Sequence, residues 1–326
     1  MSWILACMLA VFVAMVVDRR WGEPPAWAHP VVGMGRYLGM LGPALTRWPP
    51  ALAFVGGAWA WLLGACVVGA LALATELIVR LGVSAAVVQG QAPQGMSVVL
   101  NGLLMGLVLK PFLAWRMLRD EVAGVEQALT QSLLAGQTQL VRLVSRDVSV
   151  LDEVAVRESA IETLAENLND SLVAPLFWFA LGGLPAVAVY RFANTADAMW
   201  GYRGRYEWAG KWAAHVDDIL SWLPARLTAL LLCLVTGRWP GWQAMRAQAR
   251  LTPSPNGGWP MGTMALLLDV SLRKPGVYSL NETAPAPMAQ HTARALQLAG
   301  RTAWAAAVCS AIYLVCPLLW TWGHAR

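Results

Sequence analysis

Apolar residues occur along this chain in a few long runs that are separated by shorter polar segments. Four of the runs have the length that a helix needs to cross a hydrocarbon core of about 30 Å. They comprise residues 1–17, 52–79, 97–115 and 303–322. Tryptophans near their ends, such as Trp21 and Trp48, are typical of the aromatic belts at membrane surfaces. The pattern therefore predicts four membrane-spanning helices.

Two further apolar stretches, 172–192 and 219–236, are harder to interpret. The first is interrupted by a Gly-Gly-Leu-Pro run, and the second carries a proline and an arginine near its start. If both crossed fully, the segment 191–218 with its four Lys and Arg residues would lie outside, against the positive-inside rule. We therefore expect two re-entrant or interfacial helical segments, with six full spans as the alternative.

These elements predict an all-α, polytopic integral membrane protein with large helical loops, in a single domain over residues 1–326. The Lys/Arg-rich loops 18–51, 118–171 and 237–302 are expected in the cytoplasm, and loop 80–96 outside an inner (plasma) membrane. The first span is expected to be retained, because its charged residues follow the apolar run, whereas in a signal peptide they precede it.

Composition agrees with this class. Hydrophobic residues make up 57% of the chain and charged residues only 13%, against roughly 25% in soluble domains. The net charge of +5 comes from scattered basic residues without a Lys/Arg-rich run, which indicates contact with anionic lipid rather than with nucleic acid. The five cysteines lie in apolar stretches without a C-x-x-C pair, so we expect inert thiols.

Two polar clusters lie beside the predicted spans. His29 follows a proline-rich loop after the first span, and it either binds or shuttles a proton or is hydrogen-bonded to the backbone. Farther along, Glu158, Glu162, Glu166 and Asp170 recur every four residues and share one helix face. A solvated acidic face is the ordinary interpretation. The stripe runs directly into an apolar stretch, however, and carboxylates at that boundary indicate function.

Two more clusters follow. The third runs from Asn194 and Asp197 through Arg203, Arg205 and Tyr206 to the pair Asp217-Asp218. Adjacent carboxylates suit Mg²⁺, and arginines suit phosphate. The fourth is the segment 254–260, whose Gly-Gly pair permits positive φ and a cradle of backbone N–H groups for an anion. An ordinary turn is the alternative for this segment.

These clusters, in this order, resemble the cobalamin biosynthesis protein family called CbiB or CobD. The matching segments are Asp18, Gly22-Glu23-Pro24, His29-Pro30-Val31, Ala165-Glu166-Asn167, Asp170, Ala174-Pro175-Leu176-Phe177, Asn194-Thr195, Asp197, Met199, Gly201-Tyr202, Arg205-Tyr206, Asp217-Asp218, Pro224-Ala225-Arg226-Leu227, Ser254-Pro255-Asn256 and Gly258-Trp259-Pro260-Met261. The chain departs from the family pattern at Glu23, where Asp is usual, at Ser171 and at His215-Val216. No core acid is lost.

The resemblance implies an ATP-dependent ligase that joins adenosylcobyric acid to aminopropanol or its O-phosphate and gives adenosylcobinamide or its phosphate. Mg²⁺ would accompany ATP, and other enzymes of the pathway would be partners. The candidate catalytic residues are Glu166, Asp170, Asp217 and Asp218, with Glu166, Asp170 and Asp217 as metal ligands. The candidate substrate-binding residues are His29, Asn167, Asn194, Asp197, Arg203, Arg205, Tyr206, Arg226, Asn256 and Trp259.

Two other functions fit the same pattern. Acids beside apolar helices also occur in ion- or proton-coupled transporters, and the chain can equally be a non-catalytic scaffold for corrinoid enzymes.

The pair Asp217-Asp218 is predicted to divide its roles, because neighbouring residues on a helix point about 100° apart. We therefore expect one carboxylate to bind Mg²⁺ and the other to pair with Arg226, unless both cap the start of the helix.

Overall fold

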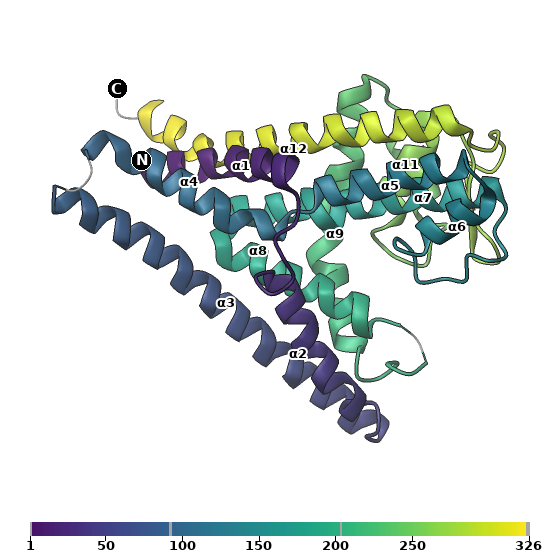
Figure 1. The fold of residues 1–326 in the computed structure, drawn as a ribbon, viewed down its shortest axis with the longest axis horizontal. Helices are drawn as coiled ribbons and strands as arrows, with labels where there is room; N and C mark the ends of the chain where they lie inside the picture. The colour runs from purple at the N-terminus through teal and green to yellow at the C-terminus, as the bar shows by residue number, and fades with distance from the viewer. Residues whose placement is uncertain (1, 91–92, 203, 324–326) are drawn as a thin grey trace. The chain divides into compact units, whose positions relative to one another are not determined.

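The structure is a computed structural model that describes residues 2–90, 93–202 and 204–323 (Figure 1). It is built of helices and one two-stranded antiparallel sheet. In chain order the elements are α1 (Ser2–Trp21), α2 (Pro30–Leu45), α3 (Pro50–Val88), η1 (Gln94–Met96), α4 (Ser97–Leu109), η2 (Lys110–Phe112), α5 (Trp115–Leu129), α6 (Leu133–Leu140), α7 (Glu153–Leu168), η3 (Asn169–Val173), α8 (Ala174–Trp200), α9 (Lys211–Thr236), α10 (Trp242–Ala249), α11 (Gly258–Leu268), β1 (Leu272–Lys274), β2 (Tyr278–Leu280) and α12 (Ala289–Gly323). The prediction of an all-α polytopic membrane protein is confirmed.

The chain forms two compact units. The first unit contains residues 1–114, 174–220 and 307–326, and the second unit contains residues 115–173 and 221–306. The described parts of α1 to α4 and α8 belong to the first unit, and α5 to α7, α10, α11 and the β-hairpin belong to the second.

By length and composition, five helices of the described chain are able to span a membrane. They are Ser2–Trp21, Pro50–Val88, Glu153–Trp200, Lys211–Thr236 and Ala289–Cys316. The helical segments Ser97–Phe112 and Trp115–Leu129, bent by 41°, add a sixth candidate as a broken span or a re-entrant loop.

This count differs from the four spans expected from the sequence. The stretches 172–192 and 219–236, expected to be re-entrant or interfacial, lie in helices long enough to cross, whereas 97–115 meets the criterion only together with α5. The prolines did not end the helices. Pro224 lies inside α9, and the interruption in α8 is confined to two glycines.

A glutamate from α3 satisfies the backbone at the break in α8. Gly182 and Gly183 have non-helical dihedrals, and Gly183 has a φ of 67°, which glycine adopts without strain. The N–H of Leu184, which has lost its helical partner, donates to Oε2 of Glu76 at 2.9 Å. A Cβ at Gly183 would meet the same oxygen at 2.6 Å. A buried N–H needs such an acceptor, so Glu76 allows α8 to break within an apolar segment.

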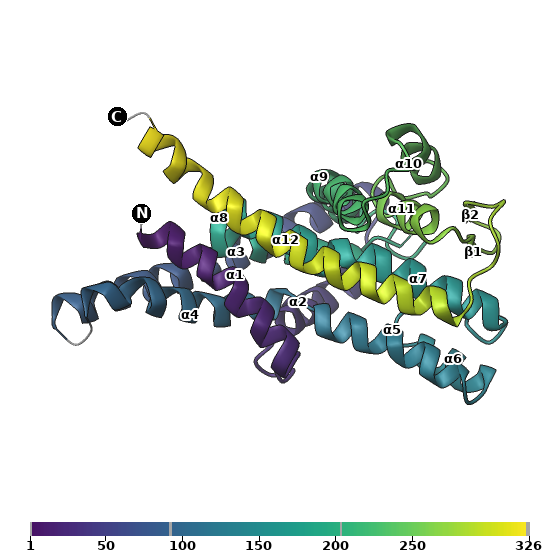
Figure 2. The same ribbon diagram turned by 90° about the horizontal axis from the view of Figure 1, so that it is seen from above.

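Small residues bring the helices of the first unit into close contact. α1 packs along α4 (Figure 2), where a Cβ at Gly106 would come within 2.5 Å of Val13 and one at Gly102 within 2.7 Å of Leu9. α3 contacts α8 in the same manner, with Gly64 beneath the ring of Phe192. Close backbone approach through glycine is the usual basis of packing between membrane helices, because lipid offers no hydrophobic driving force.

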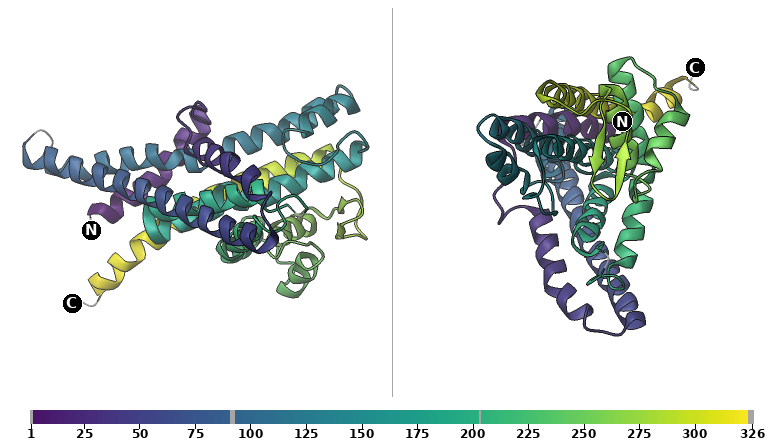
Figure 3. Two further views of the ribbon diagram at one scale, coloured as in Figure 1. Left: turned by 90° about the horizontal axis from the view of Figure 1, so that it is seen from below. Right: turned by 90° about the vertical axis from the view of Figure 1, so that its right-hand side faces the viewer.

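The second unit is organised around α7. Asp152 caps this helix by accepting from the N–H of Ala155 at 2.8 Å. α5, α6, α11 and β1 all contact α7, and β1 pairs with β2 in the short hairpin visible in Figure 3. The residues of α7 from Glu158 to Ala165 are buried. Its polar side chains must therefore find partners within the protein.

Candidate functional site

The first half of the acidic stripe on α7 is paired inside the second unit. Glu158 and Glu162 are 2% and 3% exposed. The Nε of Arg273 on β1 donates to Glu158 at 3.0 Å, and Nη2 of Arg146 donates to Glu162 at 3.2 Å. A solvated acidic face is therefore the wrong interpretation of these two residues. Buried carboxylates are tolerated because each has an opposite charge in contact.

Tyr278 on β2 adds a second partner for Glu162. Burial, together with the charges of the Glu162 and Glu166 carboxylates and a hydrogen bond with Glu162, raises the pKa of the Tyr278 hydroxyl above its usual range. The hydroxyl therefore stays protonated. It also lies 3.7 Å from Sδ of Met261 on α11, so the hairpin, α7 and α11 meet at this ring.

The second half of the stripe, Glu166 near the end of α7 and Asp170 in η3, is only partly buried. Glu166 lies beside the loop before α11, where a Cβ at Gly257 would come within 2.9 Å of its Oε1. Asp170 accepts from Nδ2 of Asn169 at 2.7 Å, and Oδ1 of Asn169 accepts from the Thr228 hydroxyl at 3.1 Å. Both carboxylates are therefore partly exposed, and that of Asp170 is held by Asn169.

The local backbone changes at this point. Residues Asn169–Val173 form one turn of π-helix, a feature frequent at functional sites. The amide nitrogen of Asn167 donates to the carbonyl of Thr163 at 3.1 Å, within its own helix. The predicted residue Asn167 therefore lies at the site with its amide nitrogen already engaged.

Arg226 of α9 is fixed beside the loop before α11. Its Nη1 donates to Oδ1 of Asn256 at 2.9 Å and to the carbonyl of Trp222 at 2.6 Å, and its Nη2 donates to the carbonyl of Pro255 at 3.2 Å. The guanidinium lies 4.3 Å from the Trp222 ring and 4.9 Å from the Trp259 ring. The structure thus brings Arg226 together with Asn256 and Trp259, which belong to a different motif of the sequence.

Arg226 and Trp259 border a cavity of about 310 Å³ in the second unit. Its wall also includes Thr252 and Ser254 and two arginines that sequence reasoning missed, Arg246 and Arg250. The two arginines are four residues apart at the end of α10, just before the Ser-Pro-Asn motif. Their spacing on one helix face was the available signal.

The expected cradle of backbone N–H groups is wrong. Gly257 has φ −56° and ψ −31°, which any residue adopts, and neither it nor Gly258 has a positive φ. The N–H groups of Asn256 and Gly257 donate to the Ser254 hydroxyl at 3.2 and 3.0 Å. The two glycines instead allow close packing, because a side chain at Gly257 would collide with Glu166 and one at Gly258 with Thr252.

His29 belongs to a charge network of the first unit. Its Nδ1 accepts from the N–H of Val31 at 3.2 Å and caps α2, and its Nε2 lies 2.9 Å from Glu23. Lys110 Nζ contacts Glu23 at 2.9 Å and Asp18 at 3.2 Å, with the Lys110 side chain 4% exposed. Burial alone would raise the pKa of the Glu23 carboxyl, but hydrogen bonds from His29 and Lys110 outweigh it and lower that pKa. Both ring nitrogens of His29 are therefore engaged, Nδ1 by the backbone and Nε2 by Glu23.

The third cluster also lies in the first unit. Asn194 accepts from Arg191 at 3.2 Å, and the carbonyl of Asp197 accepts from the N–H of Gly201 at 2.6 Å. The exposed guanidinium of Arg205 lies 5.6 Å from the Tyr206 ring. Arg203 lies outside the described residues.

Asp217 and Asp218 are the seventh and eighth residues of α9. The alternative in which both acids cap the start of this helix is therefore wrong, because the effect of the helix dipole is confined to the first turn. Both are half-buried and belong to the first unit, whereas Glu166 and Asp170 belong to the second.

Within the described residues, no group of three or more His, Cys, Asp or Glu side chains is arranged to hold a metal ion. Magnesium that arrives with a nucleotide takes ligands from phosphate and water and needs only one or two protein carboxylates. Glu166 and Asp170 fit that role, because both present carboxylate oxygens and are partly exposed.

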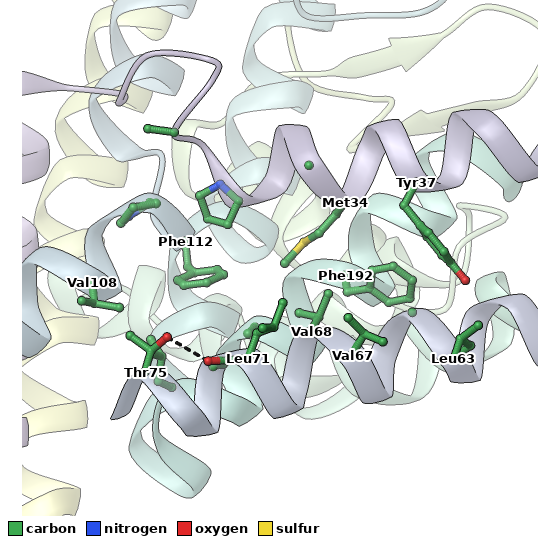
Figure 4. A pocket seen from close by; sticks show the side chains of 18 residues that line it. Met34, Tyr37, Leu63, Val67, Val68, Leu71, Thr75, Val108, Phe112 and Phe192 are labelled. Atoms are coloured by element: carbon green, nitrogen blue, oxygen red, sulfur yellow. Dashed lines mark hydrogen bonds between the residues drawn. The ribbon is translucent and has the colours of Figure 1, made fainter. Parts of the chain in front are cut away.

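A larger cavity in the first unit has a different character (Figure 4). It measures about 620 Å³ and is lined by apolar side chains of α2, α3 and α8 and residues around η2. The hydroxyls of Tyr37 and Thr75 on its wall donate to the carbonyls of Ala60 and Leu71. Among the described residues its lining carries no charged side chain, whereas three arginines line the cavity of the second unit.

Comparison with known proteins identifies relatives over most of the chain. The family model for "CobD/Cbib protein" matches residues 11–309. A probable cobalamin biosynthesis protein CobD of Thermococcus kodakarensis is 38% identical over 272 residues, which cover 83% of this chain and 84% of that protein. The cobalamin biosynthesis protein CobD of Brucella suis is 36% identical over 304 residues, 88% of each chain. The Rhodobacter capsulatus protein of the same name is 42% identical over 227 residues, 66% of this chain and 71% of that one. No solved structure matches.

Proposed function

The chain belongs to the CobD/CbiB family of cobalamin biosynthesis proteins, and from this membership we propose that it is a membrane-bound acid–amine ligase. It joins adenosylcobyric acid to aminopropanol or aminopropanol O-phosphate in an ATP-dependent reaction. The product is adenosylcobinamide or its phosphate. The substrate is accordingly a corrinoid, and the bond formed is an amide.

Amide formation from a carboxylate requires activation. In the simplest balanced scheme, a carboxylate oxygen of the corrinoid attacks the γ-phosphorus of ATP, which gives an acyl phosphate and ADP. The amine nitrogen then attacks the acyl carbon, inorganic phosphate leaves, and the nitrogen loses a proton. The protein must therefore offer positive charge to the phosphoryl group and a carboxylate to the proton.

The proximity of Glu166 to the loop that holds Arg226 carries this proposal. Glu166 lies against Gly257, and the adjacent Asn256 accepts from the Arg226 guanidinium at 2.9 Å. One short loop thus links a partly exposed carboxylate to a fixed cation. Glu166 is suited to accept the proton of the amine, and Arg226 to bind phosphoryl oxygens.

Mg²⁺, when bound with ATP, would neutralise charge on the transferred phosphoryl group. Glu166 and Asp170, both in the second unit, are its candidate ligands, and Asp217, the third candidate, belongs to the first unit. The remaining predicted residues, His29, Asn194, Asp197, Arg205 and Tyr206, lie in the first unit and stay candidates for binding the corrinoid or the amine.

We place the protein in the inner membrane with the loops 118–171 and 237–302 in the cytoplasm, where ATP is available. The Lys/Arg content of these loops supports that orientation. Other enzymes of the cobalamin pathway are the expected neighbours in the cell.

The test is amide formation by the purified full-length protein in detergent. Adenosylcobyric acid and Mg-ATP are supplied with either aminopropanol or its O-phosphate, and the corrinoid product is identified by mass. Glu166→Gln should lower turnover by about 10²-fold, the scale of a lost acid–base group. The matched control is Glu282→Gln, which removes an exposed carboxylate from the same unit.

Absence of product with both amines contradicts the proposed activity. Product formation with normal turnover in Glu166→Gln leaves the activity intact but removes Glu166 from the catalytic residues.

One observation favours the alternative of an ion-coupled transporter. Lys110 and Asp18 are buried at 4% and 0% side-chain exposure in a helical unit with candidate membrane spans. Buried ionisable groups of this kind mark ion pathways in transporters. Cation or proton uptake by proteoliposomes, without amide formation in the assay above, would favour that function.

A further inference from the structure

Within the described part of the chain, the cavity of about 310 Å³ in the second unit is lined by positively charged side chains and by no acidic one. Three arginines line it, Arg226 from α9, Arg246 from α10 and Arg250 immediately after α10. The other residues on its wall are uncharged: Ala249, Thr252, Pro253, Ser254, Pro255 and Trp259. The wall therefore concentrates positive charge without a carboxylate to balance it.

Several other arginines of the second unit are paired with acids. Arg146 contacts Glu162 and Arg273 contacts Glu158, each in an ion pair. Across the described residues, Arg246 and Arg250 form no ion pair, and Arg226 is held by neutral oxygens and aromatic rings. Like charges around one small cavity repel each other, and a bound anion would remove that cost.

The geometry of the cavity suits a phosphoryl group. A guanidinium presents a planar fork of N–H donors that matches two oxygens of a phosphate. Arg226 already has a fixed orientation, because Asn256 and Pro255 bind it on one side and Trp222 and Trp259 lie against its face. Arg246 and Arg250 are exposed and are able to close on a ligand.

The cavity also limits what is bound. Its volume is at the lower end of the range of about 300–1,000 Å³ that is typical of ligand pockets. That size accommodates a phosphate with a short organic group or the terminal phosphates of a nucleotide. The Trp259 ring, packed on Trp242 at 4.6 Å, gives the cavity one rigid aromatic wall.

We propose that this cavity is a phosphate-binding site in which Arg246 and Arg250 join Arg226 as ligands of a substrate phosphoryl group. The proposal rests on the proposed function for its two sources of phosphate, ATP and the phosphorylated amino alcohol. Both offer a terminal phosphate dianion, and binding measurements distinguish them.

The experiment is calorimetric titration of the full-length protein in detergent. The ligands are Mg-ATP, aminopropanol O-phosphate, free aminopropanol and inorganic phosphate. The variants are Arg246→Gln, Arg250→Gln and the double variant. Arg301→Gln is the matched control, because it removes an exposed arginine of the same unit that does not line the cavity. Arg246→Lys tests whether charge alone suffices.

Each substitution to Gln should weaken binding of the phosphate-bearing ligand by roughly tenfold or more, the range for hydrogen bonds to charged groups. Binding of free aminopropanol should not change. Arg301→Gln should bind as the wild type, and Arg246→Lys should fall between wild type and Arg246→Gln. A loss confined to ATP assigns the site to the nucleotide, and a loss confined to the phosphorylated amine assigns it to the amine.

Unchanged affinity for every phosphate-bearing ligand in the double variant overturns the proposal, as does a wild-type protein that binds none of them. The two proposals fail separately. Arginine-dependent phosphate binding without amide formation keeps the phosphate site and rejects the ligase, whereas amide formation with unchanged binding in the double variant does the reverse.

Discussion

The carboxylate of Glu166 lies so close to Gly257 that a Cβ at position 257 would come within 2.9 Å of Oε1. The backbone of Gly257 is in the ordinary helical region, so its glycine is required by space and not by conformation. The neighbouring Asn256 is buried and binds Arg226. The position of the acid and that of the cation therefore both depend on one loop.

Gly257→Ala should lower turnover by about tenfold or more while changing stability little. The added methyl group displaces the Glu166 carboxylate, and a shift of about 1 Å in a reacting group can cost about 10²-fold. Gly300→Ala is the control, since its new Cβ would lie 3.5 Å from Trp115, an ordinary contact. Turnover in amide formation and the midpoint of thermal unfolding are measured for both variants. Equal turnover in the two would exclude a positioning role for the loop.

Lys110→Met should destabilise the protein by about 3–5 kcal/mol, the usual effect of breaking a buried ion pair from one side. It leaves Asp18 and Glu23 close together without their cation. Lys211→Met, at an exposed position of the same unit, should change stability by less than about 0.5 kcal/mol. Unfolding in mixed micelles measures both, and equal stabilities would show that the network contributes nothing.

The Glu23 network also predicts a pH dependence. Burial opposes ionisation of Glu23, but hydrogen bonds from His29 and Lys110 hold its folded pKa below the ordinary value of 4.5. A depressed folded pKa contributes stability that is fully present above pH 4.5 and is lost as the pH falls through the folded pKa. Glu23→Gln should flatten the stability profile below pH 4.5, as measured by thermal unfolding in detergent. A variant with the wild-type profile would assign the acid sensitivity to other groups.

Asp217→Asn and Asp218→Asn should have different effects. Both residues lie inside α9, so their side chains point about 100° apart and cannot easily reach one ion. We expect one variant to need more Mg²⁺ for activity and the other to yield less folded protein at any Mg²⁺ concentration. Activity titrated with Mg²⁺ and the monodisperse yield separate the two effects. Identical behaviour of the variants would contradict a division of roles.

The predicted orientation is tested with single cysteines at Gln89 and Glu282 in a cysteine-free background. Both positions are exposed, Gln89 directly after α3 and Glu282 after the hairpin. An impermeant maleimide added to intact cells should modify Gln89→Cys and spare Glu282→Cys until the membrane is opened. Labelling of Glu282→Cys in intact cells would place loop 237–302 outside and contradict the orientation.

The acidic stripe of α7 shows how far a local pattern reaches. The four-residue spacing correctly placed Glu158, Glu162 and Glu166 on one helix. It could not distinguish acids that form buried ion pairs from an acid that stays partly exposed. The structure divides them, because Arg273 and Arg146 pair with the first two and the third faces Gly257. Nothing in the spacing of the acids identifies these partners.

Sequence alone determined the helical membrane class, the family and the motifs that supply the candidate site. The length of an apolar run and the order of motifs are properties of consecutive residues, so they do not depend on how the rest of the chain folds. The sequence also shows that Asp217 and Asp218 are adjacent, and the side chains of adjacent residues on any helix point in different directions.

Only the tertiary structure decided which charges are paired, which remain available and which distant side chain satisfies the backbone at the break in α8. Glu158 and Arg273 are 115 positions apart, Glu76 and Leu184 are 108 apart, and Arg226 and Asn256 are 30 apart. Contacts of this kind depend on how distant segments close on one another under packing and desolvation, which no local pattern records. For the same reason the sequence motifs did not identify Arg246 and Arg250 as candidate site residues, because only the fold shows that they line one cavity with Arg226.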